Sequence, residues 1–215
     1  MKRILYQFPT WLQRLVYKDA LWCGDTTRRC VYLTFDDGPV TEVTPQVLDI
    51  LDQYKVKATF FWVGENLIKY PHLAQEVVRR GHQVGNHTYN HISGWQTSHK
   101  RYIDNILKAD DIMRDTLGPQ WQPSHLFRPP YGKAGQRMHK WLKDNGYKVV
   151  LWDVVTHDYN PHYSPKRIEQ IVLRYVRNGS ILLLHDSLKS KDNTLALLPS
   201  LIHRLQLEGY EFLTL

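Results

Sequence analysis

Two aspartates stand side by side at the end of an apolar run. The segment VYLTFDDGP, residues 31–39, reads as a buried strand that ends in Asp36 and Asp37, followed by a glycine and a proline. Adjacent carboxylates repel each other, so the pair needs positive charge nearby if both are to stay ionised. A bound cation would supply it, with one aspartate as a ligand and the other as a free base. The alternative is a pair that caps the next helix.

Two histidines, His87 and His91, are four residues apart in the segment NHTYNH. This spacing lets two imidazoles on one helical turn or tight loop reach the same metal ion. The spacing alone is weak evidence, because a chain with eleven histidines will also place them on its surface and in its core. With one aspartate, however, the two histidines make a three-ligand set that leaves a position open for water, as in catalytic zinc sites.

Seven strand-like apolar runs would position these side chains. They are residues 31–35, 58–63, 82–86, 125–129, 148–154, 180–185 and 210–215. Between them apolar residues recur at helical spacing, and in four places a glycine separates such a segment from the next run. Strands that alternate with helices pair in parallel, so the pattern predicts an α/β fold in a single domain. The lack of a glycine-rich dinucleotide fingerprint favours a TIM-like barrel over an open doubly wound sheet.

Polar segments follow five of these runs. In chain order they read DDGP, NHTYNH, RPPYG, THDY and HDS. In a βα barrel the residues after the carboxyl ends of the strands build the active site. We therefore expect the five segments to meet on one face of the barrel.

The length and composition of the chain are those of a single globular domain. The chain has 215 residues, 42% of them hydrophobic, and a net charge of +7, which is enough for one domain with a sizeable core. The basic residues are spread along the chain, so nucleic acid is not predicted as a partner. Cys23 and Cys30 are predicted to be free thiols, although a single disulfide would be compatible with export.

The first 29 residues begin with a basic, amphipathic stretch, and we assign them to an N-terminal segment packed on a catalytic domain over 30–215. Trp11 and the basic residues of this stretch would also suit weak membrane-surface contact through residues 4–22. The stretch is a poor signal peptide and is too short in apolar residues to span a bilayer. Sequence alone therefore indicates the cytoplasm.

The five motifs TFDDGP, HTYNH, RPPYG, WDVVTHDY and LLLHD occur in this order and at intervals that resemble the polysaccharide deacetylase family, with its NodB-like domain, also called carbohydrate esterase family 4. The resemblance covers roughly residues 30–215. It implies a distorted (β/α)7 barrel and metal-dependent removal of an acetyl group from an N-acetylated sugar. It also makes the cell envelope an alternative location.

The resemblance implies roles for individual residues. Metal ligation falls to three residues: Asp37, His87 and His91. Proton transfer falls to Asp36 as the base and His185 as the acid, with Arg128 orienting the base and Asp158 pairing with that arginine. The remaining assignments concern the oxyanion and the substrate: Tyr131 through its backbone N–H, with Pro130, Trp152, Leu183 and Tyr159 around the acetyl group and the sugar. Asp186 receives no role.

The chain departs from the family pattern in the motif WDVVTHDY. Many members have an aspartate where this chain has Val155 and a tryptophan where it has Tyr159, which leaves the preferred glycan open. The leading substrates are N-acetylglucosamine-containing glycans, either peptidoglycan or chitin-like oligomers. An O-acetyl esterase acting on xylan is the alternative, and a non-catalytic carbohydrate-binding protein a remote one. The ligand set suits Zn²⁺ best and also accepts Co²⁺, Ni²⁺ or Mn²⁺. Oligomeric state is not predicted.

Overall fold

The computed structural model describes residues 17–215 of the chain. Its strands are β1 (Cys30–Asp36), β2 (Thr59–Trp62), β3 (Gln83–Asn86), β4 (Leu126–Phe127), β5 (Lys148–Val149), β6 (Val154–Val155), β7 (Ser180–His185) and β8 (Glu211–Phe212). Its helices are α2 (Thr44–Gln53), α3 (Gly64–Lys69), α4 (Pro71–Arg79), α5 (His99–Leu117), α6 (Gln136–Asp144), α7 (Pro165–Tyr175) and α8 (Lys191–Leu207), with a short 3₁₀ turn at Pro130–Gly132. The amphipathic segment predicted near the N-terminus falls largely on residues 1–16, which lie outside the described residues.

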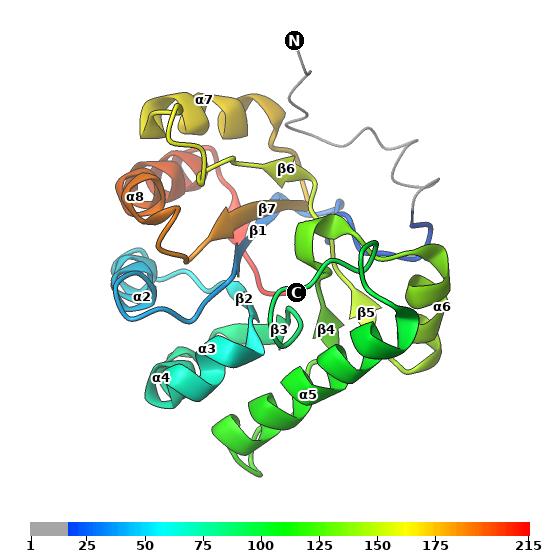
Figure 1. Cartoon of the computed structure of the whole chain (residues 1–215). Coiled ribbons are helices and arrows are strands. Elements are labelled where there is room, and N and C mark those ends of the chain that lie inside the picture. The colour runs from blue at the N-terminus through cyan, green and yellow to red at the C-terminus, as the bar shows by residue number, and fades with distance from the viewer. Residues whose placement is uncertain (1–16) are drawn as a thin grey trace.

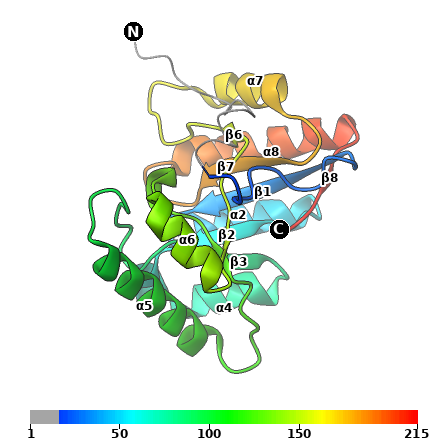
Figure 2. The ribbon, with the colours of Figure 1, turned by 90° about the vertical axis from the view of Figure 1, so that its right-hand side faces the viewer.

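The strands form one curled parallel sheet in the order β5-β4-β3-β2-β1-β7-β6, with β8 paired to β1. Helices lie around the outside of this sheet (Figures 1 and 2). Because the strands are parallel, their carboxyl ends lie at the same edge of the sheet. The predicted distorted TIM-like (β/α)7 barrel in a single domain is confirmed. One detail of the strand prediction is wrong, because the run 148–154 contains two short strands, β5 and β6, and not one.

The N-terminal segment bridges the region between β5 and β6. The Leu21 N–H donates to the Val149 carbonyl and the Leu151 N–H donates to the Leu21 carbonyl, both over 2.8 Å. A continuous apolar run could not reveal this interruption, because the partner that replaces a strand comes from more than a hundred residues away. Residues 17–23 thus complete the backbone pairing at the edge of the sheet.

Strands β1 and β7 are buried on both faces, and alternate side chains point to opposite sides of the sheet. Leu33 and Phe35 of β1 belong to the main apolar core between sheet and helices. Thr34 and Asp36 alternate with them and therefore point to the inner face, where the polar segments gather. The same alternation on β7 sends Leu182 and Leu184 outward and His185 inward.

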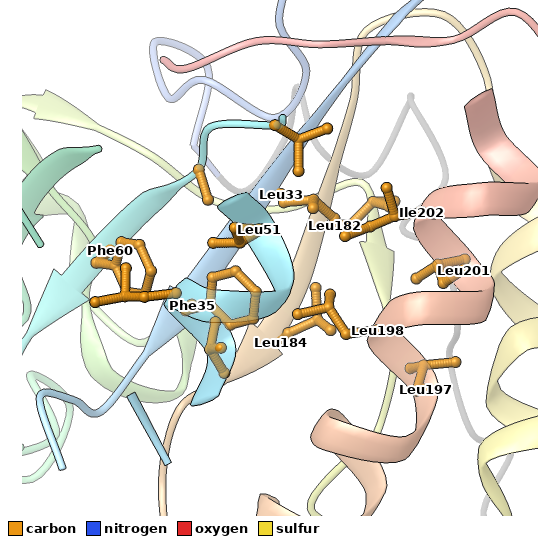
Figure 3. Close-up of a cluster of buried hydrophobic side chains, with 14 of the residues drawn as sticks. Leu33, Phe35, Leu51, Phe60, Leu182, Leu184, Leu197, Leu198, Leu201 and Ile202 are labelled. Atoms are coloured by element: carbon orange, nitrogen blue, oxygen red, sulfur yellow. The ribbon is translucent and has the colours of Figure 1, made fainter. Parts of the chain in front are cut away.

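The main core lies between the sheet and the helices that cover it (Figure 3). Side chains of β1 and β7 meet one face of α8, where five apolar residues are fully buried: Leu197, Leu198, Leu201, Ile202 and Leu205. Replacing one of these leucines by alanine would cost about 2–5 kcal/mol of stability. This rigid outer packing holds the two strands that carry Asp36 and His185 at the centre of the sheet.

Two further predictions concern local features. Gly81 and Gly146 follow the ends of α4 and α6 with φ of 79° and 80°, the left-handed conformation expected of a glycine that stops a helix. Cys23 and Cys30 are free thiols.

Within residues 17–215, no helix has both the length and the apolar character needed to cross a membrane.

Candidate active site

Asp36 ends β1 and is held by a buried arginine. Its Oδ1 accepts a hydrogen bond from Arg128 Nη1 at 2.7 Å, and both side chains are almost completely buried, at 4% and 0% exposed. A guanidinium stays charged at any relevant pH and favours the ionised form of a neighbouring carboxyl group. The pair therefore places a fixed carboxylate at the carboxyl end of the central strand.

The remaining donors of Arg128 are bonded to the surrounding barrel. Nη1 also donates to Thr34 Oγ1 at 2.8 Å, and Nη2 donates to the Leu151 carbonyl at 3.0 Å. Burial lowers the pKa of Arg128, and the charge of Asp36 acts in the opposite direction. The guanidinium is thus held by β1, through Asp36 and Thr34, and by the segment between β5 and β6, through Leu151, which leaves it little freedom to turn away from Asp36.

Asp37 lies one residue further on, in a different environment. Its backbone takes a left-handed conformation with φ of 79°, so the chain turns at this residue. Asp37 Oδ1 is buried and has no hydrogen-bond partner among the described residues. A buried carboxylate oxygen without a partner is costly, and a cation would satisfy it.

His87 offers a ring nitrogen to the same place. Its Nδ1 lies 2.6 Å from the Arg128 carbonyl, and since a carbonyl only accepts, Nδ1 carries the proton and Nε2 presents its lone pair. Nε2 lies 3.7 Å from Asp37 Oδ1. Burial lowers the pKa of His87 to about 4, which keeps the ring neutral, as a metal ligand must be.

His91 completes the cluster. Its Nε2 lies 3.2 Å from Asp37 Oδ1, and ligand atoms of Asp37, His87 and His91 all lie within 4.8 Å of one another. Burial alone would raise the pKa of Asp37, but His91, His185 and His87 together hold it well below its ordinary value. A neutral imidazole, an ionised carboxylate and an unpartnered buried oxygen fit a divalent ion bound by two histidines and one aspartate.

His185 ends β7 and pairs with a second buried carboxylate. Its Nδ1 lies 2.8 Å from Asp158 Oδ1, and its backbone N–H donates to Asp158 Oδ2 at 2.7 Å. Burial would lower the pKa of His185, but the charge and hydrogen bond of Asp158, together with the charges of Asp37 and Asp36, outweigh it and raise the pKa to about 9. The ring is therefore protonated at neutral pH.

The expected pairing of Asp158 with Arg128 is wrong. Asp158 follows β6, which lies beside β7, so its carboxylate reaches His185 and Thr194 of α8. Arg128 follows β4, on the other side of β1, and reaches Asp36. Sequence spacing could not separate these partners, because it does not contain the order of the strands in the sheet.

The predicted substrate-contacting residues lie around these groups. Tyr131 has a left-handed φ of 60° and is 62% exposed, and its ring lies 4.7 Å from that of His91. Trp152 packs near Gly132 and the Arg128 guanidinium, and Leu183 points to the inner face between Ile181 and His185. Pro130 is buried at the base of the same turn.

Tyr159 stands at the other end of the site. Its ring lies edge-on to the His185 ring with 5.3 Å between centroids, and its hydroxyl lies 2.9 Å from His157 Nδ1. Val155, where many family members have an aspartate, is buried and pairs with Leu183. The sequence departure therefore makes this wall apolar beside Leu183.

Asp186, to which the sequence assigns no role, forms two side-chain hydrogen bonds in the structure. It is fully buried under the turn that carries Asp37. Its Oδ1 accepts from the Gly38 N–H at 3.1 Å and its Oδ2 from Thr44 Oγ1 at 2.7 Å. A Cβ at Gly38 would lie 2.1 Å from Asp186 Oδ2, which explains why a glycine stands at this point. The signal in the sequence was an aspartate at the end of a buried strand.

Comparison with known proteins gives a consistent set of relatives. The family model for polysaccharide deacetylase matches residues 23–150. A peptidoglycan-N-acetylglucosamine deacetylase of Bacillus cereus is 35% identical, over 90% of this chain and 89% of its own length. A chitooligosaccharide deacetylase of Bradyrhizobium is 37% identical, over 87% and 90%. The crystal structure of the Bc1960 peptidoglycan N-acetylglucosamine deacetylase superposes with a TM-score of 0.88 at 33% identity, covering 97% of this chain and 95% of that one.

Proposed function

Because the chain belongs to the polysaccharide deacetylase family, we propose that it is a metal-dependent hydrolase that removes the acetyl group from N-acetylglucosamine units of a glycan. The substrate is peptidoglycan or a chitin-like oligomer. One observation carries this proposal: two adjacent aspartates are separated into a base held by Arg128 and a metal ligand grouped with His87 and His91.

The metal site consists of Asp37, His87 and His91. These residues would hold a divalent ion, which would lower the pKa of a water molecule towards about 7 and polarise the acetyl carbonyl. Two imidazoles and one carboxylate suit Zn²⁺, and they also accept Co²⁺, Ni²⁺ or Mn²⁺. The neutral His87 ring, with its Nε2 lone pair available, supports this assignment.

Asp36 acts as the general base. Its carboxylate accepts the proton of the attacking water, while Arg128 holds it in place through Oδ1. The other carboxylate oxygen, Oδ2, lies 3.8 Å from His87 Nε2, so this restraint fixes the base beside the proposed metal ligands. The third contact of the arginine, to Thr34, strengthens this restraint.

His185 acts as the general acid. An amine is a poor leaving group unless it is protonated, so cleavage of the amide needs a proton donor on the side of the nitrogen. The pKa of His185 is raised to about 9 by Asp158 against the effect of burial, and the ring therefore carries its proton at neutral pH. Asp158 serves as the residue that charges and orients this ring.

The acetyl group itself needs an apolar pocket and a hydrogen-bond donor. Trp152 and Leu183 line the pocket for the methyl group, with Pro130 beneath the turn. The Tyr131 N–H donates to the oxyanion that forms on the acetyl carbonyl, and removal of one such donor typically costs roughly 10²–10³ in rate. Tyr159 contacts the sugar beside the acid.

Acetate release tests the proposal directly. The purified protein is incubated with N-acetylglucosamine oligomers, peptidoglycan and acetylxylan, each with and without a chelator, and free acetate is measured. We expect chelator-sensitive release from the N-acetylated glycans. Release only from acetylxylan would replace the amidase with an O-acetyl esterase, and release that survives complete metal removal would refute the mechanism.

A further inference from the structure

Two exposed lysines lie over aromatic rings on the two sides of the active site. Lys133 Nζ is 5.3 Å from the centre of the Trp95 ring, and Lys189 Nζ is 5.1 Å from that of Tyr159. The first pair follows β3 and β4, and the second follows β6 and β7, with β1 between them in the sheet. The two ammonium groups therefore flank the strand that carries the catalytic aspartates.

The first pair is joined to the metal-binding loop. Trp95 is four residues after His91, and Lys133 is two residues after Tyr131, whose ring packs on that of His91. The two loops are locked together where the Gly94 N–H donates to the Lys133 carbonyl at 3.0 Å. A Cβ at Gly94 would lie 2.6 Å from that carbonyl oxygen, so the loops approach each other as closely as a glycine allows.

Trp95 is 64% exposed in spite of this fixed backbone. A large ring held at the surface beside a catalytic centre offers a flat apolar face, and the C–H face of a pyranose is the complementary shape. Trp95 lies one loop away from the acetyl site. It is therefore placed to contact a neighbouring sugar of the chain and not the sugar that loses its acetyl group.

The second pair is joined to the acid. The Tyr159 ring contacts the His185 ring, and Lys189 lies in the turn that follows β7. This turn is fixed by Ser190, whose hydroxyl donates to the His185 carbonyl at 2.8 Å. Asn193 Nδ2 also donates to the Asp158 carbonyl at 2.9 Å, which ties the Tyr159 loop to α8. Lys189 is therefore carried by a rigid support on the other flank of the site.

Neither ammonium group is neutralised by the protein. Within residues 17–215, no carboxylate lies within the 4.0 Å limit of an ion pair with Lys133 or Lys189. Of the carboxylates in the site, Asp36 is paired with Arg128 and Asp158 with His185, and Asp37 is grouped with His87 and His91. Two positive charges that no described carboxylate neutralises, one on each side of the site, raise the local concentration of anionic substrates.

We infer that Lys133 and Lys189 are specificity residues for a carboxylate-bearing glycan, with Trp95 as the platform for the neighbouring sugar. The inference rests on the proposed function and narrows its substrate. Peptidoglycan alternates N-acetylglucosamine with N-acetylmuramic acid, whose lactyl group carries a free carboxylate wherever the stem peptide has been removed, whereas a chitin oligomer is neutral. The chain therefore prefers the alternating, anionic glycan.

The test compares two glycans of equal length and lacking peptides: an oligomer of N-acetylglucosamine and an alternating N-acetylglucosamine–N-acetylmuramic acid oligomer. We expect the wild type to have the higher kcat/KM on the anionic glycan. Lys133→Gln and Lys189→Gln should each lower kcat/KM on that glycan about three-fold, the size of an exposed charge pair, and leave the neutral glycan unchanged. Raising the salt from about 0.05 M to about 0.5 M should remove the preference in the wild type.

Lys55→Asn is the matched control. Lys55 lies after α2, before β2, and thus at the opposite end of the parallel strands; its φ of 55° is one that asparagine tolerates. The control removes one positive charge and should leave the ratio of the two kcat/KM values at its wild-type level. An equal change in all three variants would reduce the effect to net charge and overturn the inference.

A separate variant examines the sugar platform. Trp95→Ala should raise KM several-fold on both oligomers and leave kcat unchanged, because the ring binds a sugar that does not react. A wild-type enzyme that turns over the neutral glycan better, or lysine variants that leave the ratio unchanged, would overturn the inference while acetate is still released. Failure of the proposed function is different: neither glycan would release acetate.

Discussion

The two halves of the site satisfy their charges in different ways. On the side of β1 and β3, Asp37, His87 and His91 bring their ligand atoms within 4.8 Å of one another, and a buried oxygen of Asp37 has no hydrogen-bond partner among the described residues. On the side of β6 and β7, His185 and Asp158 form a complete pair with two hydrogen bonds. The first half needs an external cation, whereas the second is complete in the protein alone.

This difference fits the chemistry that we propose for each half. A catalytic metal site must keep a position open, so its ligands cannot satisfy one another fully. A general acid must hold its proton at neutral pH, and a buried carboxylate beside it achieves this without any added group. Asp36 stands between the two halves. Like His185, it has its charged partner within the protein, because Arg128 pairs with its carboxylate.

Loss of Asp37 should have the largest effect on activity, because it removes the carboxylate that is grouped with both histidines of the proposed metal site. We expect Asp37→Ala to lower kcat/KM on an N-acetylated glycan at least about 10³-fold, which corresponds to several kcal/mol of transition-state stabilisation. A metal ion that binds only the folded state stabilises it by about 2.7 kcal/mol at a hundred times its Kd. Added Zn²⁺ should therefore raise the Tm of the wild type and not that of the variant.

The control for this experiment is Asp37→Asn. Asparagine accepts the left-handed φ of 79° at this position more readily than alanine does, so it removes the charge with less backbone strain. Both variants should lose the Zn²⁺-dependent rise in Tm. A normal rise in Asp37→Asn would show that strain, and not ligation, explains the alanine variant.

Asp36→Asn should separate turnover from metal binding. The amide cannot accept a proton from water, so we expect kcat to fall about 10²–10³-fold, within the usual range for a general base. Metal content, measured after dialysis against Zn²⁺, should stay at the wild-type level. Arg128 loses its charged partner in the barrel, so urea unfolding should show a loss of about 3 kcal/mol.

A wild-type level of turnover in Asp36→Asn would assign the base elsewhere. Loss of both metal and turnover would mean that the two aspartates act as one unit, and the contrast between the halves would not hold for β1. Thr34→Val is the matched variant, because it removes another partner of Arg128 Nη1 and leaves the carboxylate in place. It should cost stability without a comparable loss of kcat.

The positions of the site residues could be predicted because they depend on strand periodicity and on the common direction of parallel strands. Strand periodicity sends Asp36 and His185 to the inner face, and parallel strands bring the segments that follow them to one end of the sheet. The pairing of Asp158 could not be predicted in this way. It depends on β6 lying beside β7, and the order of strands is a property of the whole fold.

Other differences have similar causes. The apolar run 148–154 looks continuous, but the backbone of Leu21 pairs with residues on both sides of Val150, where no strand was foreseen to end. Helix α3 is only six residues long, too short for a helical period to stand out. Asp186 reads as a polar residue after a strand, and only its hydrogen bond to the Gly38 N–H reveals that it supports the turn.

His185→Ala should have an effect that depends on the leaving group. We expect kcat/KM to fall about 10²-fold on an N-acetylated glycan, because the amine must be protonated as it leaves. An activated acetate ester should lose less than about ten-fold, since its leaving group needs little help from an acid. Comparable losses on the two substrates would contradict the assigned role, and each substrate serves as the control for the other.

Asp158→Asn should have the smallest effect and the most specific one. Asp158 holds the pKa of His185 up, at about 9, against the effect of burial, and a general acid is active while protonated. Wild-type activity should therefore persist through neutral pH and fall as the pH rises through about 9. Without the carboxylate the pKa of His185 drops, so the alkaline limb of kcat moves to lower pH, with about a ten-fold loss near pH 7.

Thr194→Val is the matched control for this pH profile. The Thr194 hydroxyl donates to the same carboxylate at 2.8 Å, and its loss disturbs the local packing without removing the negative charge. The alkaline limb should then stay close to its wild-type position. If Asp158→Asn lowered kcat equally at every pH, the carboxylate would only position the ring. The protonation of His185 would then depend on groups outside this half of the site, and the claim that the acid half is complete in the protein alone would fail.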